Sequence, residues 1–477
     1  MLRVAAGARP VETTDGGNRM NLLRWRPLNL LFTSRLFPFV IVLPVLFVFV
    51  LVILTGLVGT PIGGANFSIV FAWIVWWGAL IVLLIPLGAR AWCAVCPIAA
   101  VGEWVQRRAI LVPGRRRPLT LGLDWPEPLR GLWLQNSAVV AMAAFSAVIL
   151  TRPFVTGAVV LALSLLALCL FLVFKRRAFC RYVCPVGGFI GLYSAAAPLE
   201  VRAVDPDICL AHCGPTAKEC IKGSAAGFGC PWMEYPGTLD RNLYCGMCTE
   251  CLKTCPKGNI AVNLRPFGAD LAVPRRQTDE AYRALIVLTS ALLYSAMMAG
   301  PWGWLRDWAN LGSGQPLAFV GYVALLMVSM LVLTPGAFFG ASWLAKAASR
   351  VREVPARRLF VAFAYTTVPL GLAAWIAFSL DFLFANASNV LPVLSDPFGW
   401  GWNLFGTAGY AWRPYLPQLL PYIQVPILTV GLAISVRLAH QISGEYIDDT
   451  AAARRSVIPV AALLTLITLI LLWLFMG

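Results

Sequence analysis

The feature that most constrains this chain is a run of closely spaced cysteines, Cys245-x2-Cys248-x2-Cys251-x3-Cys255-Pro, within residues 209–256. That segment holds eight of the thirteen cysteines. In this spacing three thiolates bind one iron–sulfur cluster, and the cysteine before the proline reaches across to a second cluster. The run therefore predicts two clusters held by one folded unit.

The other four cysteines of the segment supply the second cluster, and Cys230 again precedes a proline. Exchanging the two cysteines that precede proline gives each cluster four ligands. The first predicted set is Cys209, Cys213, Cys220 and Cys255, and the second set is Cys245, Cys248, Cys251 and Cys230. We therefore predict two [4Fe-4S] clusters in a ferredoxin-like module.

Two zinc ribbons or a disulfide scaffold are the alternatives for these eight cysteines. Zinc sites usually pair C-x2-C with a distant C-x2-C or with histidine, and they need no proline after the last ligand. Disulfides are disfavoured because the charge distribution, described next, places this segment in the reducing cytosol.

The composition is that of a membrane protein. Hydrophobic residues make up 59% of the chain and charged residues 13%, whereas soluble domains carry about 25% charged residues. Apolar runs long enough to cross a bilayer occur at about 37–59, 67–88, 131–151, 153–174, 283–301, 316–339, 358–380, 418–440 and 457–476. The predicted fold is an all-α polytopic membrane protein of about nine transmembrane helices, with an inserted cytoplasmic ferredoxin-like α+β module.

The basic residues orient this topology. With the N-terminus in the cytoplasm, all 38 Lys and Arg residues except Arg152, Arg306 and Arg413 lie on the cytoplasmic side, as the positive-inside rule requires. The net charge of +16 is therefore an orientation signal and gives no support for nucleic-acid binding. We predict a multi-pass protein of the bacterial inner membrane, with the N-terminus and the ferredoxin module cytoplasmic and the C-terminus outside.

The predicted domains follow from these spans. They are an N-terminal cytoplasmic lead-in (1–36), a four-helix membrane domain (37–199), the ferredoxin module (200–270), a linker (271–282) and a five-helix membrane domain (283–477).

An internal repeat follows the second and fourth spans. The pattern Arg-Ala-aromatic-Cys, two or three residues, then Cys-Pro occurs at Cys93 and Cys96 and again at Cys180 and Cys184. Two halves packed about a pseudo-two-fold axis would bring these four thiols together at the cytoplasmic membrane face as a metal site. The alternatives are buried structural cysteines or a thiol–disulfide relay. Cys169, alone within the fourth span, is expected to be a core residue.

With these motifs the chain resembles the membrane polyferredoxins of the NapH and NosR type over residues 35–270. The resemblance implies four transmembrane helices bearing two C-x3-C-P motifs, a cytoplasmic module with two [4Fe-4S] clusters, and electron transfer. The first motif here is one residue shorter than the family pattern, and the last five spans have no counterpart in the NapH-like architecture.

The function expected from these features is that of an integral membrane electron-transfer subunit, similar to a quinol dehydrogenase subunit. It would connect the ferredoxin clusters, a third iron–sulfur or mononuclear iron centre at the membrane face, and a quinone or a partner redox subunit of a respiratory complex. A metal-reducing maturation factor and a redox-sensing regulatory protein are the alternatives. The chain has two histidines, and one of them, His212, lies in the module, so the chain cannot supply two histidine ligands to a haem in the membrane. His440 is the candidate quinone contact.

Overall fold

The computed structural model describes residues 19–114, 117–212, 218–273, 276–350 and 353–476. Within these residues, eight helical segments are long and apolar enough to cross a membrane. They are α2 (Phe39–Val58), Phe67–Gly88, α10 (Pro153–Val173), α15 (Thr278–Met298), Pro316–Ser349, Ala356–Ser395, Pro417–Tyr446 and α23 (Thr450–Met476). The chain is therefore a multi-pass membrane protein by the length and composition of its helices.

The predicted span 131–151 is the exception. It is divided at Phe145 into α8 (Trp133–Ala144) and α9 (Ser146–Thr151), so neither helix alone has the length of a membrane span. The Ser146 hydroxyl donates to the Ala143 carbonyl over 2.9 Å, and such a side-chain bond competes with the backbone bonds of a helix. Among the described residues, eight continuous helical segments thus have the length of a span, and α8 and α9 cover the ninth predicted run in two pieces.

Several spans are built from more than one helical piece. The second span runs through α3 (Phe67–Ile69), the π-helical segment η3 (Val70–Trp76), α4 (Trp77–Ala79), a second π-helical segment η4 (Leu80–Leu84) and α5 (Ile85–Gly88). Further along the chain come α16 (Gly303–Ala309), α17 (Pro316–Val328), α18 (Thr334–Ser349), α19 (Ala356–Ala364), α20 (Thr367–Asn386), α21 (Val390–Ser395) and α22 (Leu420–Tyr446). π-Helical turns are rare in proteins, and those that do occur are often found at functional sites.

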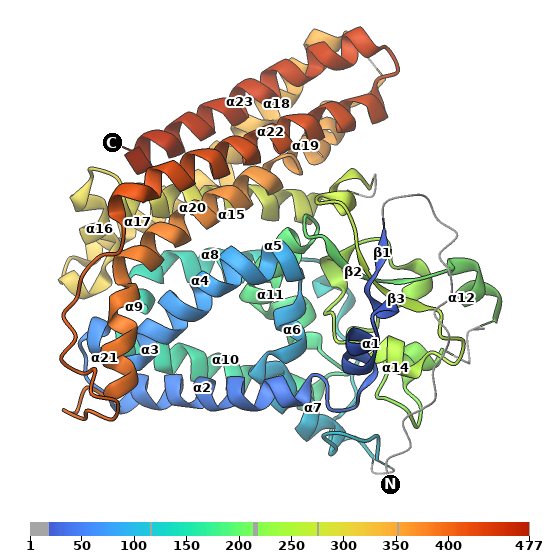
Figure 1. Ribbon diagram of the computed structural model, residues 1–477. Coiled ribbons are helices and arrows are strands. Elements are labelled where there is room, and N and C mark those ends of the chain that lie inside the picture. The colour runs from blue at the N-terminus through green and yellow to red at the C-terminus, as the bar shows by residue number, and fades with distance from the viewer. Residues whose placement is uncertain (1–18, 115–116, 213–217, 274–275, 351–352, 477) are drawn as a thin grey trace.

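The two membrane halves share one core. Buried side chains of the first half, among them Phe189 and Tyr193, belong to the same hydrophobic cluster as Leu288 on α15 and Trp375 on α20. Helix α23 packs on α18 and α22, and α22 packs on α20; Figure 1 shows α18, α22 and α23 as an oblique layer on that side of the bundle. Helices α15 and α20 therefore lie between the first half and this outer layer, because they also contact α8, α11 and the second span.

A three-stranded antiparallel sheet lies at one end of the bundle, away from α16 and α21 (Figure 1). The strand order is β1 (Met20–Asn21), β3 (Ile260–Leu264) and β2 (Leu199–Ala203). Leu264 pairs with Met20 on one side and with Leu199 on the other. The short helices α12 (Pro206–His212), α13 (Glu219–Lys222) and α14 (Glu250–Thr254) complete this module.

The N-terminal segment packs on the module. Besides supplying β1, it forms α1 (Arg26–Thr33), and the Phe32 carbonyl accepts a hydrogen bond from the Thr249 hydroxyl over 3.0 Å. Lys253 Nζ donates to the Phe37 carbonyl over 2.7 Å. Residues predicted as a separate lead-in thus help to cover the cysteine run.

Helices α2 and α10 cross where two glycines face each other. A Cβ added at Gly56 would lie 2.8 Å from the Pro153 carbonyl oxygen and 2.9 Å from the Cα of Gly157. Small residues let membrane helices approach closely at such crossings.

We expect Gly56→Ala to lower stability by about 1–3 kcal/mol through overpacking, measured by thermal unfolding of the purified protein. Gly336→Ala on α18, where a Cβ meets nothing within 4 Å, is the matched control, and equal unfolding temperatures for the two variants would contradict the packing argument.

Candidate functional site

The second cysteine of each repeat begins a helix. Cys96 and Cys184 have extended backbones, and the prolines after them start α7 (Pro97–Arg107) and α11 (Pro185–Ser194). Proline is favoured at the first helical position because its missing N–H has no partner there. The Cys184 Sγ accepts the Gly187 N–H over 3.2 Å, and Cys96 is hydrogen-bonded by backbone groups of Ile98 and Ala99. Helix N-termini favour the negative form of a thiol.

The two repeats differ in length, and a π-helix absorbs the difference. Cys93 lies on the short helix α6 (Ala91–Val95), two residues before Cys96 in the C-x2-C motif. Cys180 lies on the π-helical segment η6 (Phe179–Val183), which leads directly into Cys184. Because a π-turn holds more residues than an α-turn, the longer motif reaches the same helix-capping position as the shorter one.

The structure brings the four cysteines of the repeat together. Cys93 and Cys180 are buried, and Cys96 and Cys184 are half-buried in the same core. Burial raises the pKa of Cys180 well above the usual thiol value, and the nearby charges of Cys184, Cys96 and Cys93 raise it further. Burial likewise raises the pKa of Cys96 to about 11 and that of Cys184 to about 12. Such thiols ionise at neutral pH only when a cation binds them, and four cysteines are a donor set for iron–sulfur clusters or zinc.

The second predicted set also comes together. Burial, followed by the charges of Cys230, Cys248 and Cys245, raises the pKa of Cys251 well above the usual thiol value. Burial is also the main cause that raises the pKa of Cys230 and Cys245 to about 11 and that of Cys248 to about 12. Met247 and Thr249, between these cysteines, have positive φ angles of 54° and 57°, so the backbone winds tightly around one point.

Two members of the first predicted set meet at Asn259. Its side-chain Nδ2 lies 3.3 Å from the Cys209 Sγ, and its backbone N–H donates to the Cys255 Sγ over 3.3 Å. Cys220 is buried, and its carbonyl accepts the N–H of Cys230, a member of the second set, over 2.7 Å. Cys213 lies outside the described residues, so the structure describes three of the four predicted ligands and brings Cys209 and Cys255 together at Asn259.

Among the described residues, no three His, Cys, Asp or Glu side chains are arranged to hold a single metal ion. In a [4Fe-4S] cluster each cysteine sulfur binds a different iron, so the sulfurs stand farther apart than around one ion.

Two other predicted residues lie away from these groups. His440 is exposed on α22, and Cys169, expected in the core, is exposed on α10. The core assignment of Cys169 is wrong because an apolar side chain of a membrane helix can face lipid as readily as protein.

Sequence reasoning missed the residues that join the cysteine groups. The arginines that open the two repeats, Arg90 and Arg177, converge on Trp232 of the module, with their guanidinium carbons 4.3 Å and 6.0 Å from its ring centroid. Trp232 follows the Cys230-Pro pair and is buried. A Cβ at Gly246 would overlap the Trp232 indole nitrogen, so glycine is required between Cys245 and Met247. The repeated Arg-Ala-aromatic-Cys pattern was the sequence signal that could have identified the two arginines.

Arg177 lies between two cysteine groups. The charges of Cys180 at the membrane face and of Cys248 in the module both act on it, although Glu103 acts more strongly. Its Nε donates to Glu103 Oε1 over 2.7 Å and its Nη1 donates to the Cys93 carbonyl over 2.5 Å. Arg90 likewise acts on both groups. Burial raises the pKa of Cys184 in the membrane-face group and of Cys245 in the module, and the charge of Arg90 partly opposes this rise in each case.

The N–H groups around Trp232 fit an iron–sulfur cofactor. Arg90 Nε, Arg90 Nη2 and the Trp232 indole nitrogen are buried and have no hydrogen-bond partner. Unpaired buried donors are rare and costly. The sulfur atoms of a cluster accept such N–H groups, which also set its reduction potential.

Comparison with known proteins agrees with this arrangement. A family described as "4Fe-4S binding domain" matches residues 69–119 and 156–197, so that each match contains one Cys-Pro motif of the repeat. This match supports iron–sulfur cofactors in the chain. The comparison with solved structures found no match.

Two curated relatives show local similarity. The "Putative electron transport protein YccM" of Escherichia coli (strain K12) is 29% identical over 90 residues, 17% of this chain and 20% of the relative. The "Methylamine utilization ferredoxin-type protein MauN" of Paracoccus denitrificans (strain Pd 1222) is 28% identical over 159 residues, 30% of this chain and 53% of the relative. The chain thus spans about a fifth and about half of the lengths of these relatives. Together with the twin Cys-Pro motifs, these matches confirm the resemblance of the chain to a polyferredoxin-like membrane family.

Proposed function

We propose that this chain is an integral membrane electron-transfer protein with three iron–sulfur centres. The module holds two [4Fe-4S] clusters, one on Cys209, Cys213, Cys220 and Cys255 and one on Cys245, Cys248, Cys251 and Cys230. The third centre is held by Cys93, Cys96, Cys180 and Cys184. Electrons pass singly between these centres and then to a quinone or to a redox subunit of a larger membrane complex.

The observation that carries the proposal is the contact at Trp232. The charges of Cys180 in the membrane-face group and of Cys248 in the module both act on Arg177, so this side chain lies near both groups. Cys230, a proposed ligand of the module cluster, is joined through Pro231 to Trp232, and the Pro231 carbonyl accepts the Arg177 N–H over 3.2 Å. This proximity supports direct electron exchange between the centres.

The orientation supports an exchange that begins in the cytoplasm. The basic residues favour a cytoplasmic module in the bacterial inner membrane, and the end of α23 lies at the other end of the bundle (Figure 1). None of the described cysteines that we assign as ligands lies within a spanning segment. Reducing equivalents therefore enter or leave through the cytoplasmic half of the membrane.

Iron and acid-labile sulfide per chain test the proposal. In anaerobically purified protein we expect about 12 iron and 12 sulfide for three [4Fe-4S] clusters. A [2Fe-2S] centre at the membrane face gives about 10 of each, and a single iron bound by four thiolates gives about 9 iron with 8 sulfide. About 8 of each would remove the membrane-face centre from the proposal, and zinc in place of iron would refute it.

A further inference from the structure

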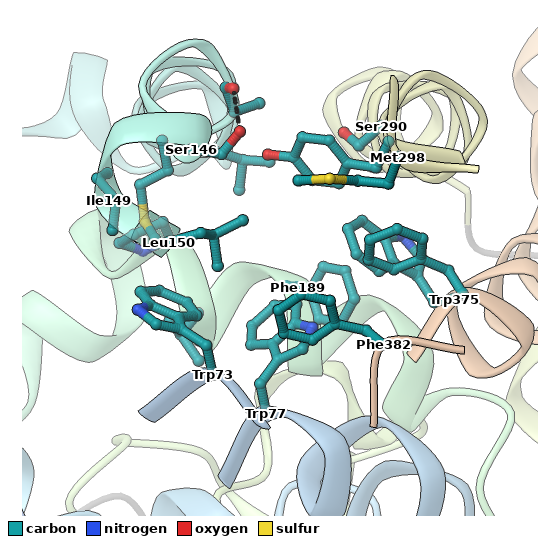
Figure 2. A pocket seen from close by; sticks show the side chains of 17 residues that line it. Trp73, Trp77, Ser146, Ile149, Leu150, Phe189, Ser290, Met298, Trp375 and Phe382 are labelled. Atoms are coloured by element: carbon teal, nitrogen blue, oxygen red, sulfur yellow. Dashed lines mark hydrogen bonds between the residues drawn. The ribbon is translucent and has the colours of Figure 1, made fainter. Parts of the chain in front are cut away.

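A pocket lies in the membrane bundle between the second span and α8, α9, α11, α15 and α20. Figure 2 shows Trp73 and Trp77 on one side of it, Phe189, Trp375 and Phe382 beside them, and Ser146 and Ser290 on the opposite side. The break between α8 and α9 places Ser146 on the pocket wall. The pocket wall thus includes the point where α8 and α9 meet.

The pocket adjoins the membrane-face cysteines. Pro185 and Val186, which line its wall, are the two residues that follow Cys184. Phe189, one turn further along α11, packs against Trp77 with ring centroids 5.4 Å apart. On the other side of the second span, Trp76 packs against Trp92, the neighbour of Cys93, at 5.3 Å. The lining of the pocket thus includes the two residues that follow Cys184 in the chain.

The lining selects the chemistry of the ligand. It contains no charged side chain, and its polar side chains are those of Ser146, Ser290, Tyr294 and the tryptophans. An ion or a nucleotide would lose its hydration there without compensation. Seven of the seventeen lining residues are aromatic, and the ring centroids of Trp77 and Trp375 lie 5.8 Å apart. The best-fitting ligand is flat, neutral and apolar, with few hydrogen-bonding groups.

Hydroxyl groups stand where such a ligand could be held. The Ser290 hydroxyl donates to the Ile286 carbonyl over 2.8 Å, which leaves its oxygen free to accept. Tyr294 is hydrogen-bonded to Ser146. Because the Ser146 hydroxyl donates to the Ala143 carbonyl, Tyr294 is the donor in that bond, and its hydrogen would turn from Ser146 to donate to a ligand carbonyl. A fatty acyl chain would use none of these groups.

We infer that this pocket binds the ring of a membrane quinone, an inference that rests on the proposed function. Reduction of the quinone to the quinol consumes two electrons, which the iron–sulfur centres supply one at a time, and two protons from the solvent. The site differs from the predicted contact at His440, which is exposed on α22 and does not line the pocket.

Photolabelling with an azido-quinone tests the site on the full-length protein in lipid nanodiscs. We expect label on peptides of α9, α15 or α20, competed by decylubiquinone. Ala143→Phe fills the pocket, so it should weaken decylubiquinone competition by about tenfold or more. Ala141→Phe, at an exposed position on the same helix, is the matched control and should bind like the wild type. Tyr294→Phe, a nearly isosteric change, tests the hydroxyl separately if Ala143→Phe does not fold.

The outcomes separate this inference from the proposed function. If phospholipid displaces the label as effectively as decylubiquinone does, the pocket is an acyl-chain site only. If the label is confined to α22, the site lies near His440. Either result overturns the inference. Electron transfer is followed by reoxidation of dithionite-reduced clusters, with decylubiquinone or ferricyanide as oxidant. Ala143→Phe should slow the first oxidant and leave ferricyanide unchanged. Specific label on a protein without iron would refute the proposed function and leave the pocket assignment standing.

Discussion

Replacing Cys184 by serine is expected to lower the iron content by about four per chain if the membrane-face centre is a [4Fe-4S] cluster, and to leave the two module clusters in place. Cys184 is the helix-capping cysteine of the second repeat, and its sulfur already accepts the Gly187 N–H. A serine oxygen can keep that cap but is a poor ligand for iron. Iron and sulfide analysis, together with electron paramagnetic resonance of the reduced protein, measures the change.

Two further variants make the Cys184 result specific. Cys96→Ser, at the equivalent position of the first repeat, should cause the same loss of iron. Cys169→Ser, exposed on α10, should keep the full iron content. The membrane-face assignment fails if Cys184→Ser retains all of its iron. Loss of every cluster together would instead show that Cys184 is needed for folding of the whole chain.

Glu103→Gln is expected to destabilise the protein by about 3–5 kcal/mol, because removal of one member of a buried ion pair leaves the other charge without compensation. The side chains of Arg177 and Glu103 are 3% and 7% exposed. Asp124→Asn is the matched control, since its partner Lys175 and Asp124 itself are 47% and 67% exposed and such pairs contribute about 0–1 kcal/mol. Thermal unfolding, followed by intrinsic fluorescence, compares the two variants with the wild type.

The pH dependence of this difference has a definite sign. Burial opposes ionisation of Glu103, but the charges of Arg107 and Arg177 outweigh it and hold the pKa of Glu103 below its ordinary value of 4.5. A carboxyl with a depressed pKa in the folded state stabilises the fold above its unfolded pKa and loses that contribution on acidification. The gap between wild type and Glu103→Gln should therefore stay constant from neutral pH to about pH 5 and shrink below about pH 4.5. A gap that widens on acidification would contradict the ion-pair assignment.

Local patterns predicted the parts of the fold that local chemistry determines. The Cys-Pro pairs become helix N-termini because proline favours that position, and the apolar runs become membrane helices because only such helices satisfy their backbone in lipid. The cysteine spacing also predicted that the thiols around Cys251 lie close together and that the thiols around Cys180 do so as well.

The remaining features depend on contacts between residues that are distant in sequence. Nothing near Trp232 in the chain indicates that Arg90 and Arg177 lie on it. The strand β1 has two residues and is recognisable only by its partner β3. The interruption at Phe145 lies inside an apolar run whose composition alone reads as one continuous span. The side of α10 that carries Cys169 is apolar, and an apolar surface can contact either protein or lipid. Its sequence therefore does not predict which of the two Cys169 faces.

The pairing of β1 with β3 has a consequence for the order in which the protein is made. Met20 pairs with Leu264, so the sheet joins residues synthesised before the first membrane helix to residues synthesised after α10. The module can therefore close only after the chain has been synthesised as far as β3, when α2 and α10 have already been made. Until then β1 has no partner strand, and we expect the cysteines of the module to be less enclosed than in the folded protein. The N-terminal strand thus joins the module late in folding.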